Sequence, residues 1–385
     1  MNKGRSIAQD IAKGIMIISV IFFHCYMLTF EDHTQVLGKF NIWVAIFPFV
    51  MTAFFFYAGY NYTPNNRTLG QNIARRTKQL LIPLVLAFVI STVLISTMEL
   101  IFHHNDVGAT FKAIGNSVLY ILMSEPLSLM IGFPKEGGII LELILSLGLL
   151  WFLYALFICS IFFYLLVKHT NKCLPLLIGV VIGLLAIAFV LGQFVGVYLP
   201  YSCGVYPVIT AIMLVAAYLR KFNLLDREIK TKKAFVLTGV NVLIAEGAVI
   251  GIGLLCHFAF GGMVTGTLMG GQYDPMLRGF DVFPGFAFAI LGTYALHYLC
   301  RLIEKVPYLG RGIGWVGAHS AFFYLFHPIF IDLVAIVVFQ KKIIWGHAQA
   351  LFYAGVVVIL LTLTGLLIDF LLKKQRTKKL ENKNV

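Results

Sequence analysis

The residues with the clearest potential for chemistry lie in the apolar stretch from Asp10 to Phe30, which contains Asp10, Lys13 and His24. Lys13 and His24 are 11 positions apart, and on an α-helix this spacing returns to within about 20° of the same face. Asp10 falls about one turn before Lys13 on that face. Ionisable groups at membrane depth are costly and normally face the interior of a bundle or a water-filled cavity. The stretch therefore predicts a helix with a polar stripe about 21 Å long.

His24 is the candidate catalytic base of this stripe. An unperturbed imidazole titrates near pH ~6.5, which suits a general base that takes a proton from an acceptor hydroxyl. The alternative is a structural imidazole hydrogen-bonded between helices. The chain has no GxSxG, HExxH or Walker A motif, so direct transfer from an activated donor fits better than hydrolysis through a serine nucleophile.

A second histidine, His327, lies in the apolar stretch HSAFFYLFHPIFIDLVAIVVF and is followed by Pro328. A proline inside a membrane helix frees backbone groups that neighbours or water must satisfy, which predicts a cavity there. Asp332 is about 140° from His327 around a helix and lies on another face.

A basic cluster precedes a later apolar stretch: Arg75, Arg76 and Lys78. One interpretation is ordinary anchoring by cytoplasmic cations. The other is an anion site for a phosphorylated ligand at a helix start, where the dipole and the cations act together.

Composition identifies an integral membrane protein. Of the 385 residues, 59% are hydrophobic and 12% are charged, against about 25% charged in soluble domains. We expect an all-α polytopic fold with about ten transmembrane helices. Their spans are 11–30, 40–61, 80–102, 147–167, 175–197, 203–219, 235–258, 282–300, 319–340 and 349–372. No cleavage-site pattern follows the first span.

The net charge of +13 follows the positive-inside rule rather than indicating nucleic acid. With the N-terminus in the cytoplasm, 24 of the 30 Lys and Arg residues lie on that side, including those of the connections at 220–234 and 301–318. We therefore predict that both termini are cytoplasmic. The six cysteines show no metal-ligand spacing, and we expect small buried hydrophobic residues and no metal site.

The chain is expected to be one membrane domain, residues 1–385, with the bundle at about 10–372. Residues 103–146 form the longest outer connection and indicate an interfacial or re-entrant segment, or alternatively an eleventh helix. Residues 373–385 form a basic tail that we expect at the anionic lipids of the inner leaflet.

In the order of its motifs, the chain resembles the acyltransferase 3 family of bacterial membrane acyltransferases. The matching segments are DIAKGIMIISVIFFH, RRTKQLLIP, WFLYALF and SAFFYLFHP. The resemblance implies transfer of an acyl group, most often acetyl from cytoplasmic acetyl-CoA, to hydroxyls of cell-surface glycans or their lipid-linked precursors. It also implies a multi-pass protein of the bacterial plasma (inner) membrane with no bound cofactor.

The resemblance implies roles for individual residues. His24 corresponds to the essential first-helix histidine. Lys13 stands where many members carry Arg, keeping the charge but not the bidentate fork. Arg75 and Lys78 match an R-x-x-R pattern and, with Arg76, are expected to hold the CoA phosphates. The remaining candidate substrate contacts are Asp10, Lys13, Trp151, Ser320 and Tyr324; His327, Ser320 or Tyr324 is expected to stabilise the oxyanion or to position the acceptor.

Two other function classes stay open from the residues alone. A transporter or flippase for a glycan lipid would use the same buried polar groups as a substrate path. A regulatory membrane sensor is a third interpretation. Consumption of the thioester separates them, because only an enzyme releases CoA from acetyl-CoA.

Overall fold

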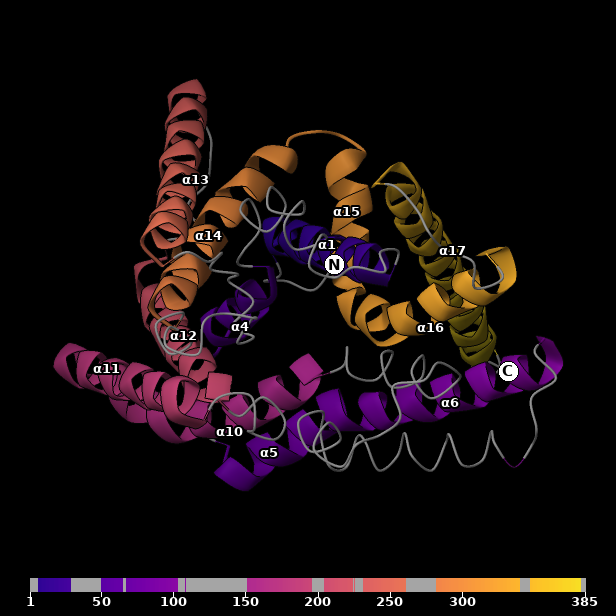
Figure 1. Ribbon diagram of the computed structural model, residues 1–385, viewed down its shortest axis with the longest axis horizontal. Helices are drawn as coiled ribbons and strands as arrows, with labels where there is room; N and C mark the ends of the chain where they lie inside the picture. The colour runs from indigo at the N-terminus through magenta and orange to yellow at the C-terminus, as the bar shows by residue number, and fades with distance from the viewer. Residues whose placement is uncertain are drawn as a thin grey trace.

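The computed structural model describes residues 6–28, 50–64, 67–102, 108, 151–195, 204–223, 225, 231–260, 282–339 and 347–381. Every regular element within these residues is helical (Figure 1), which confirms the all-α prediction. The outer segment 103–146 lies outside the described residues except for position 108, so its prediction stays untested.

The first half of the described chain consists of α1 (Ile7–Leu28), α4 (Val50–Tyr60), α5 (Leu69–Arg76), a π-helical turn (Thr77–Leu81), α6 (Ile82–Phe102), α10 (Trp151–Thr170), and α11 (Leu174–Val190) with a second π-helical turn (Leu191–Val195). The second half consists of α12 (Tyr206–Leu219), a 3₁₀ turn (Arg220–Phe222), α13 (Lys232–Phe260), α14 (Val282–Ile303), α15 (Leu309–Ala318), α16 (Ser320–Phe339) and α17 (His347–Glu381).

Within the described residues, seven helices are long and apolar enough to cross a membrane, and an eighth span is present if the bent pair α15 and α16 counts as one. All ten predicted spans overlap a helix. However, α4 and α12 have 11 and 14 described residues, fewer than the roughly 20 that a span requires. The molecule is therefore a multi-pass membrane protein, while the count of ten and the orientation of the termini stay predictions.

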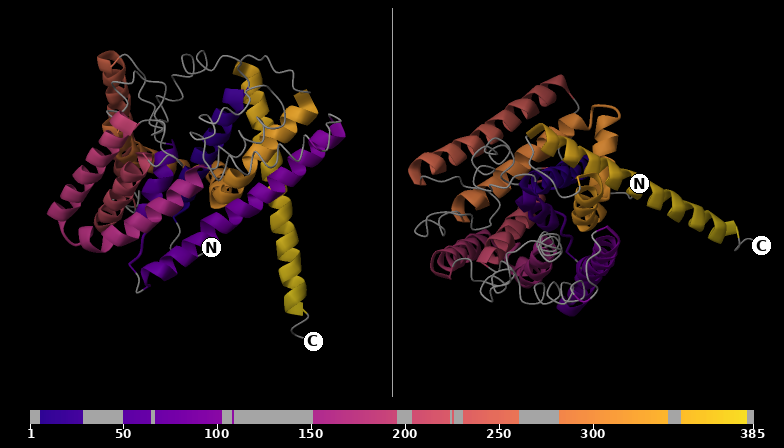
Figure 2. Two further views of the ribbon diagram at one scale, coloured as in Figure 1. Left: turned by 60° about the horizontal axis from the view of Figure 1, so that its bottom comes forward. Right: turned by 45° about the vertical axis from the view of Figure 1, so that its right-hand side comes forward.

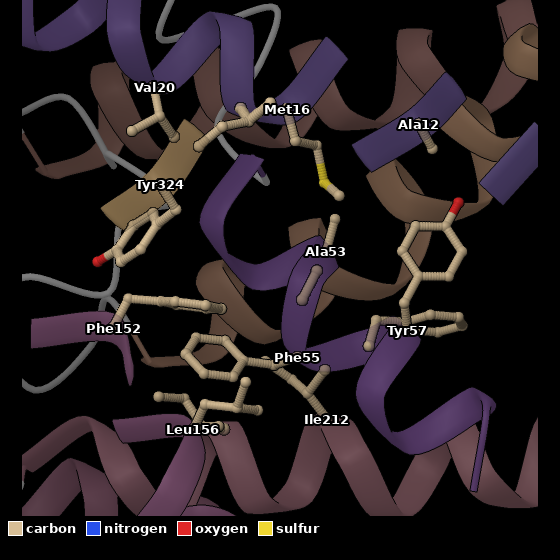
Figure 3. Packing of buried hydrophobic residues seen from close by; sticks show 14 of the residues in the cluster. Ala12, Met16, Val20, Ala53, Phe55, Tyr57, Phe152, Leu156, Ile212 and Tyr324 are labelled. Atoms are coloured by element: carbon tan, nitrogen blue, oxygen red, sulfur yellow. The ribbon is translucent and has the colours of Figure 1, made fainter. Parts of the chain in front are cut away.

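Helix α1 lies at the centre of the bundle, where it packs against α15, α17, α14, α4 and α16 (Figure 1). In the close view of the core, Met16 of α1 points toward Ala53 of α4, and Phe55 of α4 packs against Phe152, with ring centroids 4.6 Å apart (Figure 3). Many large apolar side chains of α6, α11, α13 and α17 are instead exposed, as expected for helices that contact lipid. The basic end of α17 extends away from the other helices (Figure 2).

Helix α15 corrects the expectation of a simple connection at 301–318, because residues 309–318 are helical and lie along α1. The two backbones meet at glycines. A Cβ on Gly317 would overlap the Asp10 carbonyl oxygen, and a Cβ on Gly14 would overlap that of Ile313. Small residues permit such close helix contacts in membranes. The same residues give the segment little hydrophobicity of its own, so its apolar pattern did not predict a span.

Candidate active site

The site is formed by two histidines that come together from α1 and α16, although they are 303 positions apart in the chain. Nδ1 of His24 lies 2.8 Å from Nε2 of His327. The two rings are nearly parallel and meet edge to edge, with centroids 5.1 Å apart and planes inclined by 11°. His327 is completely buried, and His24 is half-buried. This arrangement places one imidazole behind the other, with only the first partly accessible.

A backbone carbonyl determines the tautomers of this pair. Nδ1 of His327 lies 2.7 Å from the carbonyl oxygen of Tyr324. A carbonyl only accepts hydrogen bonds, so this Nδ1 carries a hydrogen, and the Nε2 of a neutral His327 is an acceptor. Nδ1 of His24 must then donate to that Nε2. The lone pair of a neutral His24 is therefore on its Nε2, which has no hydrogen-bond partner among the described residues. Such a nitrogen can accept a proton from a substrate.

Tyr324 lies next to His327, with ring centroids 5.7 Å apart, and it also contacts the start of α10. The buried Tyr324 ring packs edge-on against Phe152, with centroids 5.4 Å apart (Figure 3). The Tyr324 hydroxyl is hydrogen-bonded to the Phe152 backbone. Trp151 is the first residue of α10, and the description covers its backbone alone. Phe152 contacts Tyr324, and the predicted role of Trp151 in substrate binding stays a prediction.

The other residues of the predicted polar stripe stand apart from the histidine pair. α1 is one continuous helix, so Lys13 is about 16 Å along its axis from His24, and Asp10 is further still. Both are half-buried, and both have interactions of their own. The stripe therefore exists as a set of positions on α1, but Asp10 and Lys13 do not contact the histidines. If Asp10 or Lys13 contacts a substrate, it contacts a part of the substrate that is distant from the histidine pair.

Ser320 begins α16 just after the 80° bend that separates this helix from α15. It is seven residues before His327, which places it two turns and about 10 Å away on nearly the same face. Its neighbour His319 contacts Asp369 of α17, with Nε2 3.2 Å from Oδ2. Its Nδ1 lies 2.8 Å from the carbonyl oxygen of Trp315. This link joins the bend to α17, and no spacing in the sequence predicts it, because His319 and Asp369 are 50 positions apart.

The structure divides the basic cluster into two kinds of residue. Arg76 is half-buried and donates a hydrogen bond from Nε to the Tyr164 hydroxyl of α10, at 3.1 Å. Its guanidinium carbon is 5.9 Å from the centroid of that ring. Arg75 and Lys78 are exposed. Because Arg75 and Lys78 are three positions apart in a helical run, they share a face, and both are accessible to an anion.

Local structure determines where this cluster lies. α5 begins with a capping box, in which Thr68 accepts from the Gln71 amide and the Gln71 side chain accepts from the Thr68 amide. A π-helical turn containing Lys78 then joins α5 to α6. Another cation, Arg220, donates to the carbonyl oxygens of Tyr60 and Tyr62, at 3.1 and 3.0 Å. Arg220 thereby caps the end of α4.

Cysteine and metal chemistry were expected to play no part in the site. Cys25, Cys159 and Cys300 are buried, as expected, whereas Cys173 is exposed. The described residues contain no group of three or more His, Cys, Asp or Glu side chains that could hold a metal ion.

The comparisons with known proteins identify a family. The family model of acyltransferase 3, described as an acyltransferase domain, matches residues 7–368. The comparison with curated proteins found no match, and neither did the comparison with solved structures. The family match covers nearly the whole chain, including both histidines, the basic cluster and α10. The chain therefore belongs to the acyltransferase 3 family and is a membrane acyltransferase.

Proposed function

We propose that the chain transfers acetyl from cytoplasmic acetyl-CoA to a hydroxyl of a cell-surface glycan or of its lipid-linked precursor, with Nε2 of His24 as the general base. The observation that carries the base assignment is the hydrogen-bonded series from the Tyr324 carbonyl through His327 to His24. It leaves a lone pair on the outermost nitrogen of a half-buried ring. The acetyl donor and glycan acceptor follow from what the family resemblance implies.

The proposed reaction has two steps. The acceptor hydroxyl attacks the thioester carbonyl while Nε2 of His24 takes its proton. The tetrahedral intermediate then collapses, the C–S bond breaks, and the thiolate of CoA takes the proton back from His24. While His24 is protonated on both ring nitrogens, its Nδ1–H keeps its hydrogen bond to His327. His327 holds the ring in position much as a third group orients the base in a catalytic triad.

His327 acts in this scheme as a positioning residue. One of its ring nitrogens is used by the Tyr324 carbonyl and the other by His24, so it has no N–H left for an oxyanion. Ser320, Tyr324, Trp151, Asp10 and Lys13 remain proposed contacts for the acceptor or the donor arm. Arg75 and Lys78 are proposed to bind the CoA phosphates, and Arg76 to hold α5 against α10.

This function is tested by thioester consumption and by product. Purified protein in detergent should release CoA from acetyl-CoA in the presence of acceptor, and cells with the gene should carry more acetyl on their surface glycans than cells without it. His24→Ala should abolish both signals at unchanged protein level. Glycan export without CoA release would instead support a transporter. CoA release without any change in glycan acetylation would refute the proposed acceptor.

A further inference from the structure

Pro328 interrupts the hydrogen bonding of α16 at a particular carbonyl. In an α-helix the carbonyl of each residue accepts from the amide four positions later. Pro328 lies inside α16 and has no amide hydrogen, so the Tyr324 carbonyl lacks its regular helical donor. This carbonyl is the same one that lies 2.7 Å from Nδ1 of His327.

The Tyr324 carbonyl is buried, so the identity of its hydrogen-bond donor matters. Tyr324 and Pro328 are buried, and His327 is completely so. A buried carbonyl that loses its regular amide donor is costly unless another group donates to it. The imidazole Nδ1–H of His327, the residue before Pro328, donates to the Tyr324 carbonyl in place of the amide. The local sequence Tyr-Leu-Phe-His-Pro therefore creates an acceptor and supplies its donor within one turn.

We propose that Pro328 is a positioning residue that sets the tautomers of both histidines. Because Pro328 removes the regular amide donor of the Tyr324 carbonyl, Nδ1 of His327 donates to that oxygen and carries the hydrogen of the ring. The Nε2 of His327 then accepts from His24, and the lone pair of His24 is on its outer nitrogen. The inference rests on the proposed role of His24 as the base and adds the residue that determines which nitrogen is basic.

The opposite tautomer would reverse the chemistry. With its hydrogen on Nε2, His327 would donate to Nδ1 of His24. The hydrogen of His24 would then be on its outer nitrogen, which could only donate and could not take a proton from the acceptor. A neutral pair joined through one hydrogen bond allows only these two arrangements. Anything that occupies the Tyr324 carbonyl with another donor favours the inactive one.

The test compares two replacements at position 328 that differ in one group. Pro328→Ala restores the amide hydrogen, which competes with His327 for the Tyr324 carbonyl. Lactic acid at position 328, introduced as the ester analogue of alanine, has the same side chain but no amide hydrogen. We expect turnover to fall on the order of tenfold in Pro328→Ala, since one neutral hydrogen bond is lost from the active tautomer, and to stay near wild type in the ester variant.

The control and the second readout separate a tautomer effect from a folding effect. Pro284→Ala changes a proline in the first turn of α14, where an amide has no helical partner, and should leave activity unchanged. Nitrogen NMR of ¹⁵N-histidine-labelled protein reports which ring nitrogen carries hydrogen, with the His24 signals assigned from His24→Asn. The lone pair should be on Nε2 of His24 in wild type and in the ester variant. The fraction of protein with this tautomer should fall in Pro328→Ala.

Each outcome decides a separate claim. Equal loss in the alanine and ester variants, misfolding of both, or an unchanged tautomer in Pro328→Ala would overturn the role of the missing amide hydrogen and leave the base assignment intact. A shifted tautomer with full activity would instead overturn the proposed function of His24. If Pro328→Ala loses activity and shifts the tautomer while the ester variant does neither, the result supports both the role of Pro328 and the assignment of His24 as the base.

Discussion

The basic cluster provides a prediction in which neighbouring cations should behave differently. Arg75 and Lys78 are exposed on one face, whereas Arg76 is bonded to Tyr164. Losing a charge-assisted phosphate contact costs about 1.5–3 kcal/mol, which is about a 10- to 150-fold change in affinity. Arg75→Gln and Lys78→Gln should therefore raise KM for acetyl-CoA by about that factor. kcat should be nearly unchanged, because phosphates distant from the thioester bind the ground and transition states alike.

Arg76→Gln should mainly reduce stability. It removes a hydrogen bond worth about 1 kcal/mol and a cation–π contact worth about 0.5–1 kcal/mol, so the free energy of unfolding should fall by about 1.5–2 kcal/mol. Tyr164→Phe removes the hydroxyl but keeps the ring. In a double-mutant cycle the two changes should be less than additive, because they remove the same hydrogen bond.

The assay compares two acyl donors. KM is measured with acetyl-CoA and with acetyl-pantetheine, which lacks the nucleotide phosphates, and melting in detergent is followed in parallel. With acetyl-pantetheine as the donor, the KM values of wild type, Arg75→Gln and Lys78→Gln should be the same. An equal rise in KM with both donors, or a larger KM effect for Arg76→Gln than for its exposed neighbours, would refute the division of the cluster.

Three further predictions concern the rest of the fold and site. Gly317→Ala should destabilise the protein by about 1–3 kcal/mol, because its Cβ would overlap the Asp10 carbonyl of α1. Gly312→Ala, with open space around it, is the matched control, and equal melting of the two variants would contradict this contact. His327→Gln, whose amide oxygen can accept from His24, should keep more kcat than His327→Leu at similar KM for acetyl-CoA; equal kcat would argue against a positioning role. Single cysteines at Glu228 and Asn382 should resist membrane-impermeant labelling in intact cells, and labelling of either would overturn the cytoplasmic assignment of the 220–234 connection or of the C-terminus.

Much of the fold follows from apolar runs in the sequence. The predicted spans coincide with helices because long apolar stretches have to be helical in lipid. α15 did not follow, because its Gly-rich sequence lacks a long apolar run, and in the structure it packs against α1. The span predicted at 40–61 lies partly outside the described residues, which leaves the number of spans open. Length and hydropathy therefore predict the long apolar helices and miss the short helices α5 and α15.

The site was predictable in its members but not in their contacts. His24 and His327 were both singled out, yet nothing in their spacing shows that their rings are hydrogen-bonded to each other. The signal for the tautomers was present, since Pro328 identifies Tyr324 as the residue whose carbonyl lacks its regular helical amide donor. The role of Arg76 depends on Tyr164, and that contact requires α5 to lie against α10. Spacing within one helix can be read from a sequence, whereas contacts between helices need the packed structure.

The central claim is that Nε2 of His24 takes the proton of the acceptor hydroxyl, and His24→Asn tests it most directly. The Asn amide reaches roughly the position of Nδ1 and can still donate to His327, so the bundle should be retained while the basic nitrogen is lost. Purified His24→Asn should melt within a few degrees of wild type, and its kcat for acetyl transfer should fall by about 10²- to 10⁴-fold, the usual contribution of a general base. A kcat within a few-fold of wild type, at the same melting temperature, would contradict the account.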